Sequence, residues 1–311
     1  MASTNVYEII SDRIIDELEK GIIPWHRPWV CVGKGYGKAV SHTNGRPYSL
    51  LNQLLLGKPG EYITWNQCKK EGGSVRKGAK AKMVCFWKML PVDKTDANGA
   101  PIIDEKTGKT VQKVIPYLKY YNVFHVEDCD GITAKYANVT APQVPASVAE
   151  IDANAEKVLR DYIAREGITL EEVESDEAYY SPAQDLIHLP IREQFENTAE
   201  YYSTAFHESV HSTGHKSRLD RLTTGRAAAF GGQDYSKEEL VAELGAASIC
   251  HALGLETGSS FKNSVAYIQS WLKALRNDKR MIVTAASKAE KAVALIFGDA
   301  ETAEAADVAE A

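Results

Sequence analysis

The 311-residue sequence has no uninterrupted apolar stretch that approaches the ~20 residues needed to span a bilayer. Its first residues, Met-Ala-Ser-Thr-Asn-Val-Tyr-Glu, lack the basic start and apolar core of a signal peptide. The hydrophobic fraction of 44% and the mean hydropathy of −0.30 are typical of a globular protein in water. We therefore expect a cytoplasmic protein with no membrane partner.

Cysteine is scarce, and its five positions are scattered along the chain without a C-x-x-C pair. They are Cys31, Cys68, Cys85, Cys129 and Cys250. An odd number of cysteines at irregular spacing indicates reduced thiols rather than a disulfide framework. The same spacing argues against a cysteine zinc site.

Acidic side chains are nearly absent from residues 20–90, which hold 13 Lys and Arg against two acids, a net charge of +11. Residues 131–311 hold 17 Lys and Arg against 28 Asp and Glu, a net charge of −11. The overall net charge of −6 hides this asymmetry. A basic part followed by an acidic part suggests two functions, the first with a polyanionic partner.

The length predicts about two domains. A stretch that contains Pro142 and Pro145 has the composition of a linker. We place the first domain at 1–140, the second at 141–300 and an acidic, disordered tail at 301–311. Apolar periodicity predicts helices over 6–20, 49–56, 147–166, 197–214, 236–253, 259–277 and 287–297, and strands over 83–90, 118–126 and 185–189. The expected fold class is α+β.

The most specific chemical pattern is His-Glu-Ser-Val-His at 207–211. Residues four apart lie on one face of a helix, so His207 and His211 can bind one metal ion. Glu208, next to the first histidine, can act as general base toward water at that ion. The competing interpretation is that one histidine is a satisfied core residue and the other is exposed.

A catalytic zinc ion needs three protein ligands. We expect Glu239 to be the third, with Glu243 one turn later accepting the other ring N–H of a ligand histidine; the reverse assignment is open. Glu239 could instead complete a capping box with Ser236. His215 is a further alternative, because Ser217 occupies the position at which a longer zinc motif has its third histidine. One Zn²⁺, or another divalent ion such as Mn²⁺, is the expected cofactor.

The basic N-terminal part combines cations with aromatic residues, as a groove for single-stranded nucleic acid requires. Its lysines could also be a solvated surface, and its tryptophans a core. The candidate contacts are Lys34, Lys38, Arg46, Tyr48, Trp65, Lys69, Lys70, Arg76, Lys77, Lys80 and Lys82.

An ordered series of motifs carries a family resemblance. In the first half they are GIIPWxxPW at 21–29, NGRPYSLLN at 44–52, YITW at 62–65, GGxVRKGxK at 72–80 and VCFW at 84–87. In the second half they are DxIxLP at 185–190, HExxHxTGHxxRL at 207–219 and YxxEELVAE at 235–243. Together they resemble ArdC-type antirestriction proteins.

The resemblance implies an N-terminal domain of mixed α+β structure that binds single-stranded DNA with little sequence preference. It also implies a mainly helical, zincin-like metallopeptidase domain with a small antiparallel sheet, whose edge strand, expected at 185–189, holds extended substrate. Such a protein protects incoming plasmid or phage DNA from host restriction enzymes during conjugative transfer, with a restriction-modification component as a candidate protein target. The alternative function is pure occlusion of DNA, with a structural or vestigial metal site. Phosphodiester hydrolysis is disfavoured, because such sites hold two metals and this ligand set provides for one.

Overall fold

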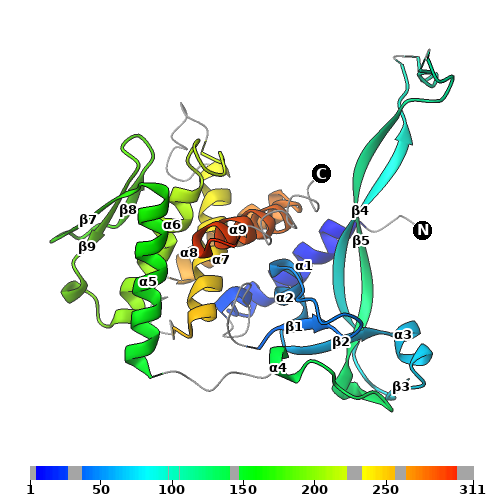
Figure 1. The fold of residues 1–311 in the computed structure, drawn as a ribbon, viewed down its shortest axis with the longest axis horizontal. Helices are drawn as coiled ribbons and strands as arrows, with labels where there is room; N and C mark the ends of the chain where they lie inside the picture. The colour runs from blue at the N-terminus through cyan, green and yellow to red at the C-terminus, as the bar shows by residue number, and fades with distance from the viewer. Residues whose placement is uncertain are drawn as a thin grey trace.

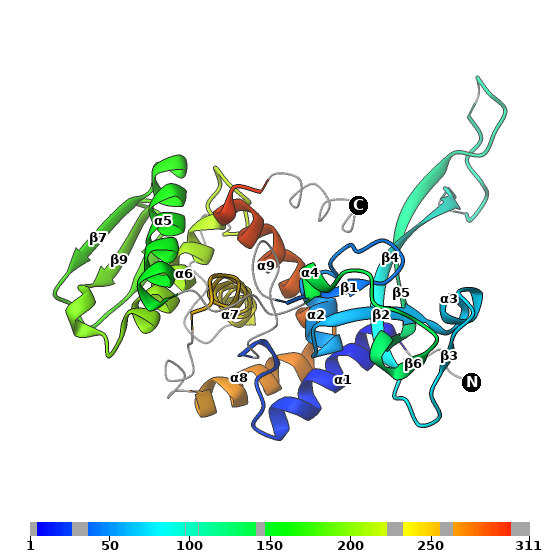
Figure 2. The same cartoon turned by 60° about the horizontal axis from the view of Figure 1, so that its bottom comes forward.

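The computed structural model describes residues 5–26, 37–96, 98–104, 106–140, 147–222, 233–255 and 264–299. Figure 1 shows a central group of helices with a small sheet on one side and the N-terminal sheet on the other. A long β-ribbon projects away from the N-terminal sheet (Figures 1 and 2). The predicted tail at 301–311 lies outside the described residues.

The N-terminal part is built on a four-stranded sheet with the order β1-β2-β5-β4. The β1–β2 pair is parallel, and the other two pairs are antiparallel. A second, two-stranded sheet joins β3 and β6. The elements are α1 (Val6–Glu19), η1 (Pro24–His26), β1 (Ala39–Ser41), α2 (Leu50–Leu56), β2 (Gly60–Thr64), α3 (Trp65–Lys70), β3 (Ser74–Val75), β4 (Lys82–Asp93), β5 (Gln112–His125), η2 (Val126–Asp128), β6 (Cys129–Asp130) and α4 (Ala137–Thr140).

Strands β4 and β5 form the projecting ribbon, which we call the arm. They pair in antiparallel register along the whole of β4, from Lys82 opposite Val123 to Asp93 opposite Gln112. The inner end of the arm is buried against the body, whereas its outer half is largely exposed. Both strands of the arm extend farther from the body than predicted. The polar, turn-rich segment that connects them is correspondingly shorter than the sequence indicates.

The C-terminal part places helices around a three-stranded sheet with the order β7-β9-β8. The β7–β9 pair is parallel and the β9–β8 pair antiparallel. The elements are α5 (Val148–Glu166), β7 (Thr169–Val173), β8 (Tyr179–Ser181), β9 (Leu186–Pro190), η3 (Arg192–Gln194), α6 (Thr198–Thr213), α7 (Gln233–Leu253), α8 (Ser264–Asn277) and α9 (Met281–Phe297).

One hydrophobic core joins the two parts of the chain. The apolar face of α1, with Ile10 and Ile14 buried, packs on α8 and α9, and α2 also contacts α9. The same continuous cluster holds Leu50 of α2, Phe206 of α6 and Ile282 of α9. Side chains at i and i+4 share a helix face, which is why the apolar spacing of the first twenty residues buries α1 against a partner. The predicted boundary at residue 140 therefore does not divide the core.

The predicted α+β fold class is confirmed, with corrections in the C-terminal sheet. This sheet is mixed rather than antiparallel, because β7 pairs with β9 in parallel. Strand β9, expected as the edge strand at 185–189, lies between β7 and β8, so β8 is an edge and β9 is not. The sequence interpretation missed β7 because Thr-Leu-Glu-Glu-Val at 169–173 has two adjacent acids and only two apolar residues. None of the helices in the described ranges is long and apolar enough to cross a membrane.

Candidate functional site

Helices α6 and α7 approach each other closely enough to share one site. Gly245 of α7 faces Val210 of α6, and a Cβ at Gly245 would lie 2.7 Å from Val210 Cγ2. Only a residue without a side chain fits at this distance. Because α6 buries Phe206 and Val210 completely, its neighbouring face presents His207 and His211 to α7.

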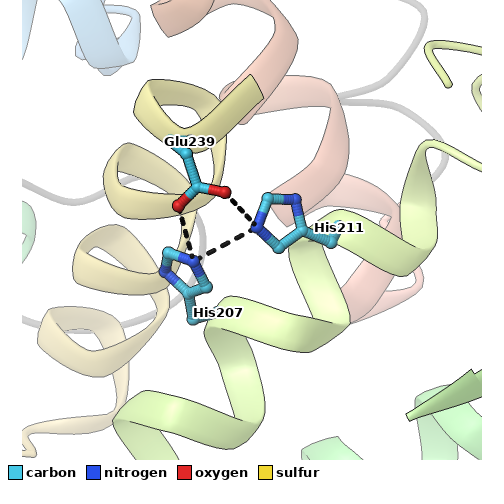
Figure 3. A group of neighbouring side chains, drawn as sticks. All are labelled: His207, His211 and Glu239. Atoms are coloured by element: carbon cyan, nitrogen blue, oxygen red, sulfur yellow. Dashed lines mark hydrogen bonds and ion pairs between the residues drawn. The ribbon is translucent and has the colours of Figure 1, made fainter. Parts of the chain in front are cut away.

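Three ligand-type side chains converge between the two helices (Figure 3). His207 Nε2 lies 3.2 Å from His211 Nε2. One oxygen of Glu239 lies 3.5 Å from His207 Nε2 and the other lies 3.4 Å from His211 Nε2. Among the described residues, these three form the group of His, Cys, Asp and Glu side chains that could hold a metal ion.

These separations can be compared with the edges of a tetrahedral metal site. With metal–nitrogen and metal–oxygen distances of about 2.0–2.2 Å, two ligands of a tetrahedron lie about 3.3–3.6 Å apart. The separation of 3.2 Å between the two nitrogens is close to this range, whereas the 3.4 and 3.5 Å separations join the two histidines to different oxygens of Glu239. With one carboxylate oxygen as ligand, the three ligand atoms all lie within 4.8 Å of one another. Two imidazoles and a carboxylate also form the donor set of a catalytic zinc site. The three side chains therefore fit one divalent ion.

A second layer of carboxylates lies behind the two histidines. Glu243 Oε1 is 3.8 Å from His207 Nδ1, and Glu238 Oε1 is 3.5 Å from His211 Nδ1. Arg221 Nη2 in turn donates to Glu238 Oε1 at 2.8 Å, and its guanidinium is buried. Each imidazole thus has a carboxylate oxygen near its far nitrogen, and the negative charge favours the protonated ring.

Glu243 lies near His207 Nδ1, at a distance longer than the hydrogen bond that was predicted for it, and Glu238 was not predicted. The signal for Glu238 was available in the sequence, because two adjacent glutamates on one helix can serve histidines that are one turn apart on the facing helix. What was missing was Arg221, which lies far from the helix in sequence and whose guanidinium compensates the carboxylate charge.

Burial and carboxylates act in opposite directions on the pKa values of the histidines. Burial disfavours the imidazolium, but the carboxylates of Glu238 and Glu239 outweigh it and raise the pKa of His211 to about 10. The pKa of His207 is raised as well, against burial, chiefly by Glu239. Conversely, burial would raise the pKa of Glu239, but the two imidazoles hold it well below its usual range. Without an ion, the surrounding carboxylates therefore favour the protonated form of both histidines.

The remaining candidates for this site lie in different surroundings. Glu208 is buried, with 7% of the residue exposed, and its charge favours protonation of both ligand-type histidines. His215 lies outside the ligand group, with Nδ1 2.7 Å from Ser217 Oγ. The capping role considered for Glu239 is wrong, because α7 begins at Gln233 and Ser236 is inside the helix.

A residue from the N-terminal part reaches the same cluster. His26 Nε2 of η1 lies 3.8 Å from Glu243 Oε2. The adjacent Trp25 is fully buried and packs edge-on against Trp271 of α8, with ring centroids 5.1 Å apart. Trp25 is thus a core residue, as the alternative interpretation of the tryptophans predicts. Its packing anchors η1 beside α7, the helix that carries Glu239.

A separate groove of about 840 Å³ lies on the N-terminal sheet. Aromatic rings follow one another along it: Tyr48 and Phe86 have centroids 6.1 Å apart, as do Phe86 and Tyr121. Trp65 is 44% exposed, and Lys69 lies over its ring at 5.3 Å. The lining residues are Ser41, Asn44, Arg46, Pro47, Tyr48, Ser49, Asn52, Thr64, Trp65, Asn66, Gln67, Val84, Cys85, Phe86, Trp87, Tyr121, Asn122 and Val123.

Only some of the predicted nucleic-acid contacts line the groove. Arg46, Tyr48 and Trp65 line the groove, whereas Lys38 is buried and Lys34 lies outside the described residues. The other predicted cations are exposed on α3 and on the chain that leads into β4: Lys69, Lys70, Arg76, Lys77, Lys80 and Lys82. The sequence interpretation missed Phe86 and Tyr121, although exposed aromatic residues on paired strands were a usable signal.

Comparisons with known proteins match both parts of the chain. Residues 4–124 match the family described as the N-terminal domain of anti-restriction factor ArdC. Residues 157–288 match the family described as zincin-like metallopeptidase. The metal-free crystal structure of antirestriction ArdC from plasmid R388 is 34% identical, with a TM-score of 0.68, and the match covers 95% of this chain and 98% of that one. The chain belongs to the ArdC antirestriction family.

Other ArdC-like relatives extend the comparison. The Mn(II)-bound structure of the R388 protein is 33% identical, with the same coverage and TM-score. An uncharacterised Sinorhizobium fredii protein, y4eC, is 32% identical over 93% of this chain and 90% of its own length. Two Escherichia coli DNA primases TraC are 34% and 33% identical over 92% of this chain, which spans only 26% and 19% of their lengths.

Proposed function

We propose that this ArdC-family chain is an antirestriction protein that binds single-stranded DNA and carries one divalent ion in a metallopeptidase-like site. The observation that supports the second half is the convergence of His207, His211 and Glu239, whose ligand atoms all lie within 4.8 Å of one another. The Mn(II)-bound structure of the R388 relative supports a divalent ion, and the two imidazoles and one carboxylate favour Zn²⁺.

In this proposal His207, His211 and Glu239 hold the ion, while Glu243 and Glu238 orient the two imidazoles. When bound, the ion would polarise a scissile carbonyl and acidify the attacking water. The Glu208 carboxylate takes the proton of that water and delivers it to the leaving amine nitrogen. Its low exposure keeps the carboxylate away from bulk water.

For DNA, the proposed site is the groove on the N-terminal sheet. Exposed Trp65, Phe86 and Tyr121 offer faces on which bases can stack, and Arg46 with the cations of α3 offers phosphate contacts. Stacking and charge neutralisation do not distinguish one sequence from another, so little sequence preference is expected. The proposed outcome is protection of incoming DNA from host restriction, with a restriction-modification component as the peptidase target.

The decisive experiment for the metal site is Glu208→Gln, assayed for plasmid transfer into a restricting recipient. Loss of the general base should lower peptidase turnover by about 10²–10⁴-fold while metal content, measured by atomic absorption, is unchanged. Glu193→Gln, an exposed acid in η3, is the control. If protection survives Glu208→Gln with full metal content, occlusion of DNA explains antirestriction and the peptidase role is wrong.

The DNA half is tested separately with Trp65→Ala. Loss of one stacking platform should weaken binding of labelled single strands by about 5- to 150-fold. Tyr179→Ala is the control, because this residue is similarly exposed at 42% but lies in the C-terminal sheet. Unchanged affinity for Trp65→Ala, or binding that does not weaken with added salt, would place the DNA elsewhere.

A further inference from the structure

The arm carries two chemically different faces. Directly opposed residues of an antiparallel pair point to the same side, and successive residues alternate. Cys85 and Leu118 lie on the side that packs against the body, and Trp87 of the same side packs against Tyr7 of α1. The other side, which we call the outer face, is the one that carries Phe86.

The outer face continues the aromatic row of the groove. Val84 opposes Tyr121, Phe86 opposes Lys119, and Lys88 opposes Tyr117. Phe86, Tyr121 and Tyr117 are 46%, 47% and 48% exposed. The row therefore leaves the groove at Phe86 and Tyr121 and runs outward along the projecting ribbon (Figure 1).

The charge on the outer face has one sign. Its residues in the two paired strands include four lysines and no acid: Lys82, Lys88, Lys113 and Lys119. Within the part of the chain that the structure describes, none of these lysines forms an ion pair. The one acid on the arm's strands, Asp93, opposes Gln112 and so lies on the other face. Unpaired cations between exposed rings match a polyanion that also offers bases for stacking.

The spacing of residues along the outer face determines which form of nucleic acid can follow it. Same-face residues along a strand are two positions apart, about 6.8 Å. Stacked bases in a duplex rise only ~3.4 Å per step and are enclosed between two backbones. A strand that follows the arm must therefore be extended and unstacked, which a single strand can be and a duplex cannot.

We propose that single-stranded nucleic acid continues out of the groove along the outer face of the arm, with Tyr117 stacking a base and Lys88 and Lys119 contacting phosphates. This inference rests on the proposed function and specifies the path of the strand. It makes the arm a second segment of the binding site, occupied only by strands long enough to reach beyond the groove.

The test compares two oligonucleotide lengths by fluorescence anisotropy with the full chain. The short one has about 4 nucleotides and the long one about 16, the two ends of the range for single-strand sites. Tyr117→Ala should weaken binding of the long strand by about 5- to 150-fold and leave the short strand unchanged. The matched control is Tyr120→Ala, since Tyr120 is 46% exposed on the same strand but opposes Cys85 and so lies on the other face.

The lysines are tested by salt dependence. The double variant Lys88→Gln and Lys119→Gln should reduce the slope of log affinity against log salt by about 1.4 for the long strand, about 0.7 for each phosphate that is no longer neutralised. Lys157→Gln, an exposed lysine of α5, should leave the slope unchanged.

Two results would overturn the proposal. One is an affinity for the long strand that none of the arm variants alters, although Trp65→Ala still weakens binding; the DNA function would then stand without the arm. The other is an equal loss for Tyr117→Ala and Tyr120→Ala, which would show that no one face of the arm is used. Loss of the Trp65→Ala effect itself would instead reject the groove and with it the proposed DNA function.

Discussion

Metal binding to this site is expected to release protons. The pKa values of the three candidate ligands limit how many are released. The His211 pKa of about 10 means that its imidazole is protonated throughout the neutral range without an ion. A metal ligand must be neutral, so at least that proton leaves when an ion binds. The pKa of His207 is raised as well, so a proton that it carries also leaves when an ion binds. Glu239 adds none, because its pKa is held low.

The magnitude follows from linkage. Each proton released makes the apparent binding constant rise tenfold per pH unit, or about 1.4 kcal/mol of binding free energy. Between pH 6 and pH 8, Mn²⁺ binding should therefore tighten by about 100-fold for one proton and by up to about 10,000-fold for two. The sign is fixed: affinity rises with pH, because protons and metal compete for the same nitrogens.

The assay is isothermal titration calorimetry of Mn²⁺ at fixed pH in buffers of different ionisation enthalpy, whose slope counts protons directly. Glu238→Gln is the informative variant. Without the carboxylate beside His211 Nδ1, the pKa of His211 should fall and fewer protons should be released near pH 8, while intrinsic affinity drops about 10- to 100-fold. Release of no proton at pH 6–7, or an affinity that is constant across this range, would refute the electrostatic description of the site.

Three further outcomes are expected. Gly245→Ala should destabilise the fold by about 1–3 kcal/mol in urea titrations and weaken Mn²⁺ binding, and adding Val210→Ala should restore both, because the clash is with that side chain. Burial raises the pKa of Glu290 to about 7, against its hydrogen bond from Leu50 N, so the stability it contributes in acid is lost as pH rises through 7. Glu290→Gln should accordingly raise stability at pH 8 by about 3 kcal/mol and change little at pH 4. Chelation of metal held at about 100 times its Kd should lower the unfolding free energy by about 2.7 kcal/mol, seen as a lower melting temperature.

Much of the site could be predicted from the sequence because its chemistry is local. The i, i+4 spacing of His207 and His211, and of Glu239 and Glu243, needs only helices to bring each pair onto one face. The approach of the two helices depends on a contact between Gly245 and Val210, which the apolar periodicity of the sequence does not predict. The contact of Arg221 with Glu238 likewise depends on how the chain after α6 folds back onto that helix.

The fold was less predictable where strands carry few apolar residues. β7 has an alternating exposed pattern with acids at adjacent positions, and it forms because β9 offers it a parallel partner. That pairing moves β9 from the edge to the centre of its sheet. The outer half of the arm has a similar explanation. Its strands extend through Lys113 and Asp93, residue types that are depleted in strands, because cross-strand pairing continues beyond the body.

The shared core has a consequence for how this protein can be divided. A cut in the predicted linker would leave α1 and α2 on one fragment and their packing partners α8 and α9 on the other, so each fragment would expose apolar surface that it cannot cover alone. The unit that can be transplanted into another protein is then the whole chain rather than either half. The TraC primases are consistent with this, because the region that they share with the chain covers 92% of it and so includes both halves. A protein that acquired only α6 and α7 would leave the apolar residues of this core exposed.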